Sequence, residues 1–108
     1  MNRIDALFET LIQEGGSDLH LLESQPPKIR KHGEIRPIRE AALDHEEMIA
    51  LLQPLASPAA WQKFVEHGDL DFAYEMSEEA RFRCNYYKQL HGYGAIFRII
   101  PTRIKTIA

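Results

Sequence analysis

Residues 69–100, DLDFAYEMSEEARFRCNYYKQLHGYGAIFRII, alternate between apolar and polar side chains over most of their length. The apolar series runs through Leu70, Phe72, Tyr74 and Met76, and then through Phe82, Cys84 and Tyr86. A period of two is typical of strands that bury one face. The polar run Ser77-Glu78-Glu79 predicts one turn, Gly92 and Gly94 bracket another, and residues 93–100 predict a last strand that Pro101 ends.

The N-terminal third combines a helical pattern with three extended segments. One apolar stripe recurs at helical spacing, at Ile4, Leu7, Phe8, Leu11 and Ile12, and Gly15-Gly16 supplies a stop after it. Extended chain is predicted for residues 17–22, 28–32 and 34–38, with Gly33 as a tight turn between the last two. The candidate core contacts of these segments are Leu19, Ile29, Ile35 and Ile38.

Two helices are predicted between these segments and the alternating region. Asp44 with Glu47 three residues later has the spacing of a capping box, and Ser57-Pro58 starts a second helix that Gly68 ends. Because strands come in runs and helices as a pair, the pattern favours an α+β fold over alternating β-α-β units. We expect a mostly antiparallel sheet of about six strands, with the helices packed on one face.

The composition predicts one cytoplasmic domain. The chain has 108 residues, 44% of them hydrophobic, and a formal net charge of −3, which gives no electrostatic reason to expect nucleic acid as a partner. Cys84 is the single cysteine, so an intramolecular disulfide and a cysteine-only zinc site are excluded. The N-terminus does not read as a signal peptide, and no apolar run approaches the ~20 residues that span a bilayer.

Arginines cluster on the predicted polar face of the alternating region. Arg81 and Arg83 are two residues apart, so they emerge from one face roughly 7 Å apart, and Arg98 lies on the neighbouring predicted strand. Three guanidiniums converging on one rim would suit a polyanion such as a triphosphate, since the planar fork of arginine bonds phosphate oxygens in pairs. The competing interpretation is a set of cross-strand salt bridges, because carboxylates occupy the matching face of the preceding strand at Asp69, Asp71 and Glu75.

The remaining reactive side chains predict no catalytic site. Asp18 and His20 share a strand face and could bind a metal ion weakly, but metal sites need three or four ligands. His91-Gly92-Tyr93-Gly94 contains GxG and favours a hairpin turn over a dinucleotide loop. Cys84 falls on the apolar face and reads as a small core residue. A GxxxxGK[ST] phosphate loop is missing from the sequence, so we predict that these 108 residues do not hydrolyse ATP.

Six ordered segments resemble the N-terminal region of type IV pilus retraction ATPases, the PilT-like branch of the secretion-motor superfamily. They are Gly16-Ser17-Asp18-Leu19-His20-Leu21, Pro26-Pro27 with Arg30 and Gly33, Asp69-Leu70-Asp71-Phe72, Ala80-Arg81-Phe82-Arg83 with Asn85, Gly92-Tyr93-Gly94-Ala95, and Phe97-Arg98-Ile99-Ile100-Pro101. Each segment is weak alone, whereas the ordered set is specific and covers the chain from Ile4 to its end. Within it, Asp18 is predicted to cap or brace a turn.

The resemblance implies a PAS-like N-terminal domain over residues 1–101 and, over residues 102–108, the start of a linker to an absent RecA-like ATPase domain. In this family the nucleotide sits between the two domains, and arginines of the N-terminal domain reach its phosphates. Arg81, Arg83 and Arg98 are therefore the candidate phosphate contacts, with ATP and Mg²⁺ as cofactors of the full-length protein. The resemblance implies no metal ligand and no tightly bound cofactor in the 108 residues alone.

The function implied by the resemblance is nucleotide clamping and subunit contact in a hexameric motor that powers pilus retraction and twitching motility. The implied partners are the ATPase domains of the same and the neighbouring subunit and an inner-membrane pilus platform protein, at the cytoplasmic side of the inner membrane. The alternative is a stand-alone PAS-like sensor or protein-interaction domain, holding a small molecule between helices and sheet. Alone, the domain is expected to be monomeric and to bind ATP weakly, because exposed arginines without a phosphate loop lack preorganisation.

Overall fold

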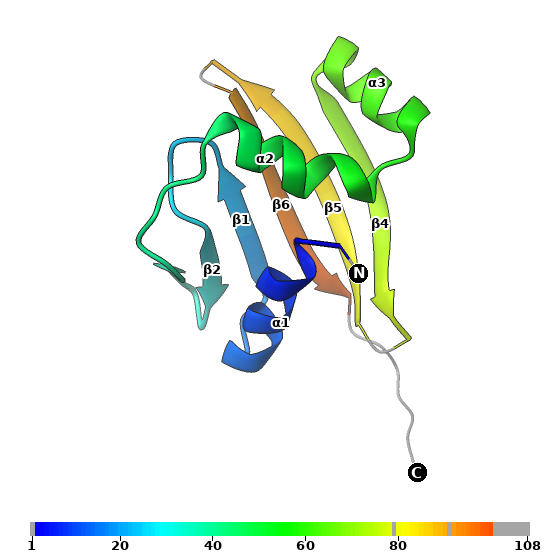
Figure 1. The fold of residues 1–108 in the computed structure, drawn as a ribbon. Helices are drawn as coiled ribbons and strands as arrows, with labels where there is room; N and C mark the ends of the chain where they lie inside the picture. Colours follow the sequence, from blue (N-terminus) through cyan, green and yellow to red (C-terminus); the bar gives the residue numbers. More distant parts are fainter. Residues whose placement is uncertain (1, 79, 91, 101–108) are drawn as a thin grey trace.

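A computed structural model describes residues 2–78, 80–90 and 92–100 (Figure 1). The helices are α1 (Asp5–Glu14), α2 (His45–Leu52) and α3 (Pro58–His67), and a short 3-10 turn, η1 (Gln53–Leu55), follows α2. The strands are β1 (Asp18–Leu22), β2 (Lys28–Lys31), β3 (Glu34–Pro37), β4 (Asp69–Ser77), β5 (Ala80–Gln89) and β6 (Gly92–Ile100). The predicted strand end at Pro101 and the predicted linker, residues 102–108, lie outside the described residues.

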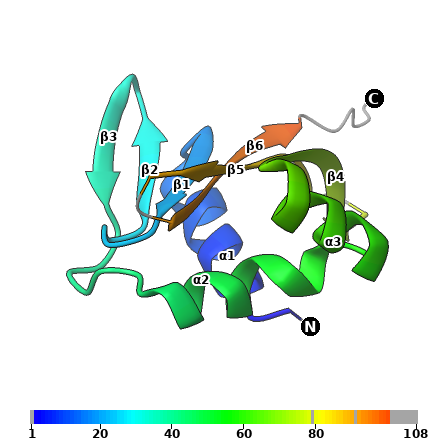
Figure 2. The same cartoon turned by 90° about the horizontal axis from the view of Figure 1, so that it is seen from above.

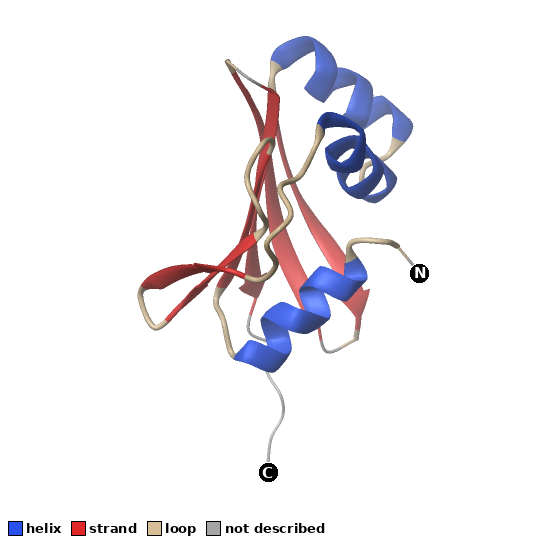
Figure 3. Ribbon diagram, turned by 60° about the vertical axis from the view of Figure 1, so that its left-hand side comes forward, coloured by secondary structure: helices blue, strands red, loops and turns tan. Residues whose placement is uncertain are grey.

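The six strands form one antiparallel sheet in the order β3-β2-β1-β6-β5-β4. Strands β1 and β6, from opposite ends of the chain, are therefore neighbours in the middle of the sheet. All three helices lie on the same side of the sheet, as Figures 2 and 3 show from two directions. This arrangement confirms the predicted α+β fold with a six-stranded antiparallel sheet. Within the described residues, the opposite face of the sheet carries no helix.

Aromatic rings fill the space between the helices and the sheet. The ring of Phe8 on α1 stacks on that of Phe82 on β5, with centroids 4.0 Å apart, and meets Phe97 edge-on at 5.1 Å. Tyr86 and Phe64 pack edge-on at 5.6 Å beneath α3. All five side chains are fully buried, and burial of such large rings is a dominant source of stability in a domain of this size.

The helix ends follow the local chemistry predicted for them. The Asp44 carboxylate accepts a hydrogen bond from the Glu47 backbone N–H at 2.8 Å, and the Ser57 hydroxyl accepts one from the Ala60 N–H at 3.1 Å. Gly68 ends α3 with φ 90°, a left-handed conformation that favours glycine. No helix in the described part of the chain is long and apolar enough to cross a membrane.

One predicted core residue is wrong. Ile35 is 48% exposed, because its register partner is Arg30 and this pairing places it on the uncovered face of the sheet. Its neighbour on β2, Ile29, points to the helices instead and is 2% exposed. The turn between the two strands uses positive φ at both His32 and Gly33, so it confirms the predicted tight turn but needs two left-handed residues rather than one.

Candidate functional site

A row of charged side chains crosses the uncovered face of the sheet. Arg83 on β5 is the direct register partner of Arg98 on β6. Arg98 is in turn the partner of Asp18 on β1, and Asp18 is the partner of Arg30 on β2. Register partners in adjacent antiparallel strands share a face, so these four residues form one continuous line. We call Arg30, Asp18, Arg98 and Arg83 the arginine row.

Two of the three arginines in this row, Arg83 and Arg98, make ion pairs, and both pairs are long. Arg83 Nη2 lies 3.4 Å from Asp71 Oδ2, and the two side chains are 66% and 59% exposed. Arg98 Nε lies 3.5 Å from Asp18 Oδ2, where the arginine is 70% exposed and the carboxylate only 8%. Both distances exceed those of a strong charge-assisted hydrogen bond. The two guanidiniums are therefore open to solvent and available to a second anion.

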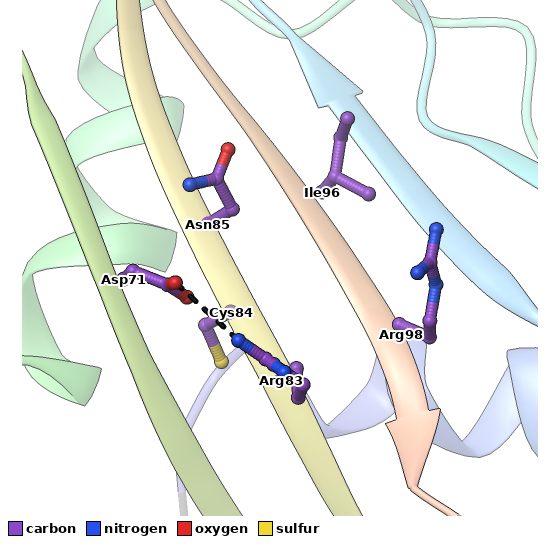
Figure 4. Close-up of a pocket in the computed structure, with 6 residues that line it drawn as sticks. All are labelled: Asp71, Arg83, Cys84, Asn85, Ile96 and Arg98. Atoms are coloured by element: carbon purple, nitrogen blue, oxygen red, sulfur yellow. Dashed lines mark hydrogen bonds and ion pairs between the residues drawn. The ribbon is translucent and has the colours of Figure 1, made fainter.

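Arg83 and Arg98 flank a shallow depression of about 370 Å³, lined by Asp71, Arg83, Cys84, Asn85, Ile96 and Arg98. In Figure 4 the Arg83 side chain leans towards Asp71, whereas that of Arg98 leans away towards β1. In this arrangement the two guanidiniums point away from each other. Each guanidinium is drawn outwards by a carboxylate on the strand beyond it, and the space between them is left open.

Arg81 lies apart from this pair. It is two residues before Arg83 on the same face of β5, with Glu75 and Ile100 as its register partners. Its side chain is exposed but does not line the depression. Of the three predicted salt-bridge carboxylates, Asp71 pairs with Arg83, whereas Asp69 and Glu75 make no ion pair with any described residue. The structure thus brings together two of the three predicted arginines.

Sequence reasoning missed the parts that Asp18 and Arg30 play. Asp18 is the first residue of β1 and its buried carboxylate contacts Arg98, so it braces an arginine rather than the predicted turn. Arg30 adds a third guanidinium to the row and makes no ion pair with a described residue. Within its own strand, Asp18 shares a face with Leu22, and Arg30 shares a face with Lys28. The sequence of each strand gives no sign that either residue lies beside Arg98. The register between strands is what aligns them with Arg98.

Two further side chains near the arginine row have shifted pKa values, His20 on the uncovered face and Cys84 on the buried face. Burial lowers the pKa of His20, and the nearby Arg30, Arg98 and Lys28 lower it further, against the opposing effect of Asp18. Burial raises the pKa of the Cys84 thiol to about 12, which agrees with its predicted place in the core. Within the described residues, no group of three or more His, Cys, Asp or Glu side chains could hold a metal ion, so Asp18 and His20 remain a pair.

Comparison with known proteins gives one clear line of similarity. No family model matches the chain. The type IV pilus retraction ATPase PilT of Pseudomonas aeruginosa is 38% identical over 104 residues, which cover 96% of this chain and 30% of that protein. The chain therefore spans less than a third of this relative.

Solved structures agree with the sequence match. The crystal structure of the pilus retraction motor PilT with bound ADP superposes with a TM-score of 0.84 at 26% identity, over 97% of this chain and 31% of that one. The ATPase DotB of Legionella pneumophila superposes over 91% of this chain and 29% of its own, with a TM-score of 0.82 at 22% identity, a likeness of fold.

Proposed function

We propose that this chain, which is homologous to the N-terminal region of the pilus retraction ATPase PilT, is the nucleotide-clamping and subunit-contact domain of a hexameric motor. In this proposal the motor powers type IV pilus retraction and twitching motility. The observation that carries the proposal is the pair Arg83 and Arg98, aligned across two strands on either side of an open depression.

The geometry of this pair suits the phosphates of ATP. Both guanidiniums are about two-thirds exposed, and their present carboxylate contacts are 3.4 Å and 3.5 Å long. A polyphosphate entering the depression would offer shorter, bidentate contacts and more negative charge than a single carboxylate. The arginines would then turn inwards from Asp71 and Asp18, with Arg30 and Arg81 adding positive charge from either side.

This arrangement gives the domain a role in the hydrolytic cycle. Phosphoryl transfer is accelerated mainly by positioning and by stabilising the charge that develops on the transferred group. Arginines delivered by a second domain do both, and they lose their partner when the γ-phosphate leaves. The domain is then free to rotate relative to the ATPase domain, and rigid-body rotation of this kind is how a ring can convert hydrolysis into movement.

The proposal extends to the other parts of the full-length motor. A RecA-like ATPase domain, reached through residues 102–108 after the domain of residues 1–101, would hold ATP, and Mg²⁺ would accompany the nucleotide there. The domain would contact the ATPase domains of its own and the neighbouring subunit. The ring would work on the cytoplasmic side of the inner membrane, against a pilus platform protein.

The test is a comparison of single alanine substitutions in the full-length ATPase. Arg83→Ala and Arg98→Ala should each lower ATP turnover by about 100-fold or more, since a lost transition-state donor costs that much. Arg36→Ala is the matched control, because Arg36 is an exposed strand arginine whose partner, Ile29, faces the helices. Full activity in Arg81→Ala, Arg83→Ala and Arg98→Ala alike would refute the phosphate role.

The stand-alone sensor is the less favoured alternative. Such a sensor would hold its ligand between the helices and the sheet, and that space is filled here by the buried rings of Phe8, Phe64, Phe82, Tyr86 and Phe97. A GxxxxGK[ST] motif in the reading frame after Ala108 supports the motor, whereas a stop codon together with a co-purified small molecule supports the sensor.

A further inference from the structure

A second depression lies on the same uncovered face, further along the strands from the arginine row. It has a volume of about 180 Å³, and its walls include His20, Leu22, Pro26, Lys28, Ile35 and Tyr87. These residues come from four strands, β1, β2, β3 and β5, and from the β1–β2 loop. The walls are mainly apolar or aromatic, with a lysine and an imidazole among them. This mixture differs from the charged surroundings of Arg83 and Arg98.

Tyr87 owes its position in this depression to a glycine. Gly94 is the register partner of both Tyr87 on β5 and Leu22 on β1. A Cβ atom on Gly94 would lie 2.5 Å from the tyrosine ring, so the ring occupies the space directly over this residue. The ring therefore crosses β6 and reaches the β1 side of the face. The tyrosine hydroxyl makes no hydrogen bond with any described residue.

His20 contributes an unsatisfied polar atom at the same place. Its Nε2 is buried and has no hydrogen-bond partner among the described residues. A buried polar atom without a partner is costly, and the cost is recovered when a ligand supplies the missing bond. Burial lowers the pKa of this imidazole most, Asp18 raises it, and Arg30, Arg98 and Lys28 lower it further. The depression thus combines an aromatic ring with an imidazole whose Nε2 lacks a partner among the described residues.

Size and position relate this depression to the arginine row. At about 180 Å³ it is smaller than the ~300–1,000 Å³ pockets that take whole drug-sized ligands, so it suits one ring system. His20 follows Asp18 by two residues on β1, which places the depression roughly 7 Å along the strand from the row. A molecule with phosphates at one end and a planar ring at the other would reach both.

We propose that this depression is a nucleobase subsite, in which the Tyr87 ring and the aliphatic walls at Leu22 and Ile35 hold the base of the nucleotide whose phosphates lie against Arg98 and Arg83. The inference rests on the proposed function for the identity of the ligand. A tyrosine that merely covers a strand glycine is the competing explanation for this geometry. The subsite proposal requires the Tyr87 ring to contact the ligand, whereas the competing explanation does not.

The test is NMR titration of this 108-residue chain with two separate halves of the ligand, adenosine and inorganic tripolyphosphate. Adenosine should shift the backbone amide signals of His20, Leu22, Tyr87 and Gly94. Tripolyphosphate should instead shift those of Asp18, Arg83 and Arg98. Tyr87→Ala should weaken adenosine binding about fivefold or more, as expected for loss of one stacking ring, and leave tripolyphosphate binding unchanged. Tyr87→Phe, which keeps the ring, should bind adenosine like the natural chain.

The outcomes separate the two proposals. Tripolyphosphate shifts without adenosine shifts, or unchanged adenosine binding by Tyr87→Ala, would overturn the nucleobase subsite and leave the phosphate role standing. Adenosine shifts without tripolyphosphate shifts would overturn the phosphate role instead. If Tyr87→Ala does not fold, Ile35→Ser provides the same comparison. Ile35 is 48% exposed, so its replacement spares the core, and unchanged adenosine binding by this variant would count against the subsite.

Discussion

Arg83 and Arg98 face each other across β5 and β6, yet their guanidiniums contact carboxylates on opposite sides, Asp71 and Asp18. The two carboxylates differ strongly in burial, since the Asp71 side chain is 59% exposed and that of Asp18 only 8%. Water can solvate Asp71 when its arginine turns away. Asp18 has little access to water, so losing its contact with Arg98 costs this carboxylate more than losing Arg83 costs Asp71.

Removing these two arginines should therefore have unequal effects on stability. Arg98→Ala leaves a buried carboxylate without its ion-pair partner and should lower the free energy of unfolding by about 1–3 kcal/mol. Arg83→Ala breaks an exposed pair and should change it by less than about 1 kcal/mol. Urea denaturation followed by far-UV circular dichroism measures both.

A double-mutant cycle isolates the cause of this difference. Asp18→Asn should recover most of the stability lost in Arg98→Ala, because the neutral amide is less costly to bury than an unpaired charge. The corresponding change Asp71→Asn should leave Arg83→Ala nearly unaffected. Equal losses in the two arginine variants, with no recovery by Asp18→Asn, would show that the burial of Asp18 carries no such penalty.

The Tyr86 hydroxyl should contribute measurably to the attachment of α2. It donates a hydrogen bond of 2.8 Å to the Leu52 carbonyl, and both residues are fully buried. Tyr86→Phe keeps the ring in the aromatic cluster but leaves that carbonyl without its donor, so it should cost about 1–3 kcal/mol of unfolding free energy. Tyr87→Phe is the matched control, because its hydroxyl bonds no described residue. Similar denaturation midpoints for the two variants would contradict this role.

Local patterns in the sequence were enough to predict the elements, because their chemistry is local. The alternation of Phe82, Cys84 and Tyr86 specifies a strand and its buried face, and the Asp44 and Ser57 caps specify two helix starts. Which residues meet across strands depends on register, and a slip of one residue exchanges the faces. That dependence explains why Ile35 was misplaced.

The candidate site shows the same limit. Arg83 and Arg98 could be assigned to neighbouring strands, but their direct pairing and their outward lean required the structure. Asp18 and Arg30 join them only because β1 and β2 continue the same line of register. Asp18 and Arg98 are 80 residues apart in the chain, so their contact leaves no local pattern in the sequence.

Cys84 should be chemically inert in the folded protein. Its side chain is fully buried and burial raises the pKa of the thiol to about 12, so almost no thiolate exists at neutral pH. Thiolate is the reactive species towards disulfide reagents. Ellman's reagent at pH 8 should therefore label the folded chain at least about 100-fold more slowly than the urea-unfolded chain. Labelling at equal rates in the two states would mean that the thiol is accessible.

Stability at mildly acidic pH should depend on His20. Its pKa is lowered in the folded chain by burial and by the charges of Arg30, Arg98 and Lys28, with Asp18 opposing them. Near pH 6.5, the ordinary pKa of histidine, the unfolded chain therefore binds more protons at this imidazole than the folded chain does. Protonation then favours unfolding, so stability is fully present above about pH 6.5 and falls as the pH drops below it.

His20→Gln removes this titration, and its effect should be visible as a difference in slope. Between pH 8 and pH 5 the free energy of unfolding of the natural chain should fall more steeply than that of the variant, with the two curves parting below about pH 6.5. His32→Gln is the control, because His32 lies in the exposed β2–β3 turn, away from the buried position of His20. Parallel curves for the natural chain and His20→Gln would mean that the imidazole accepts its proton as readily in the sheet as in the unfolded chain.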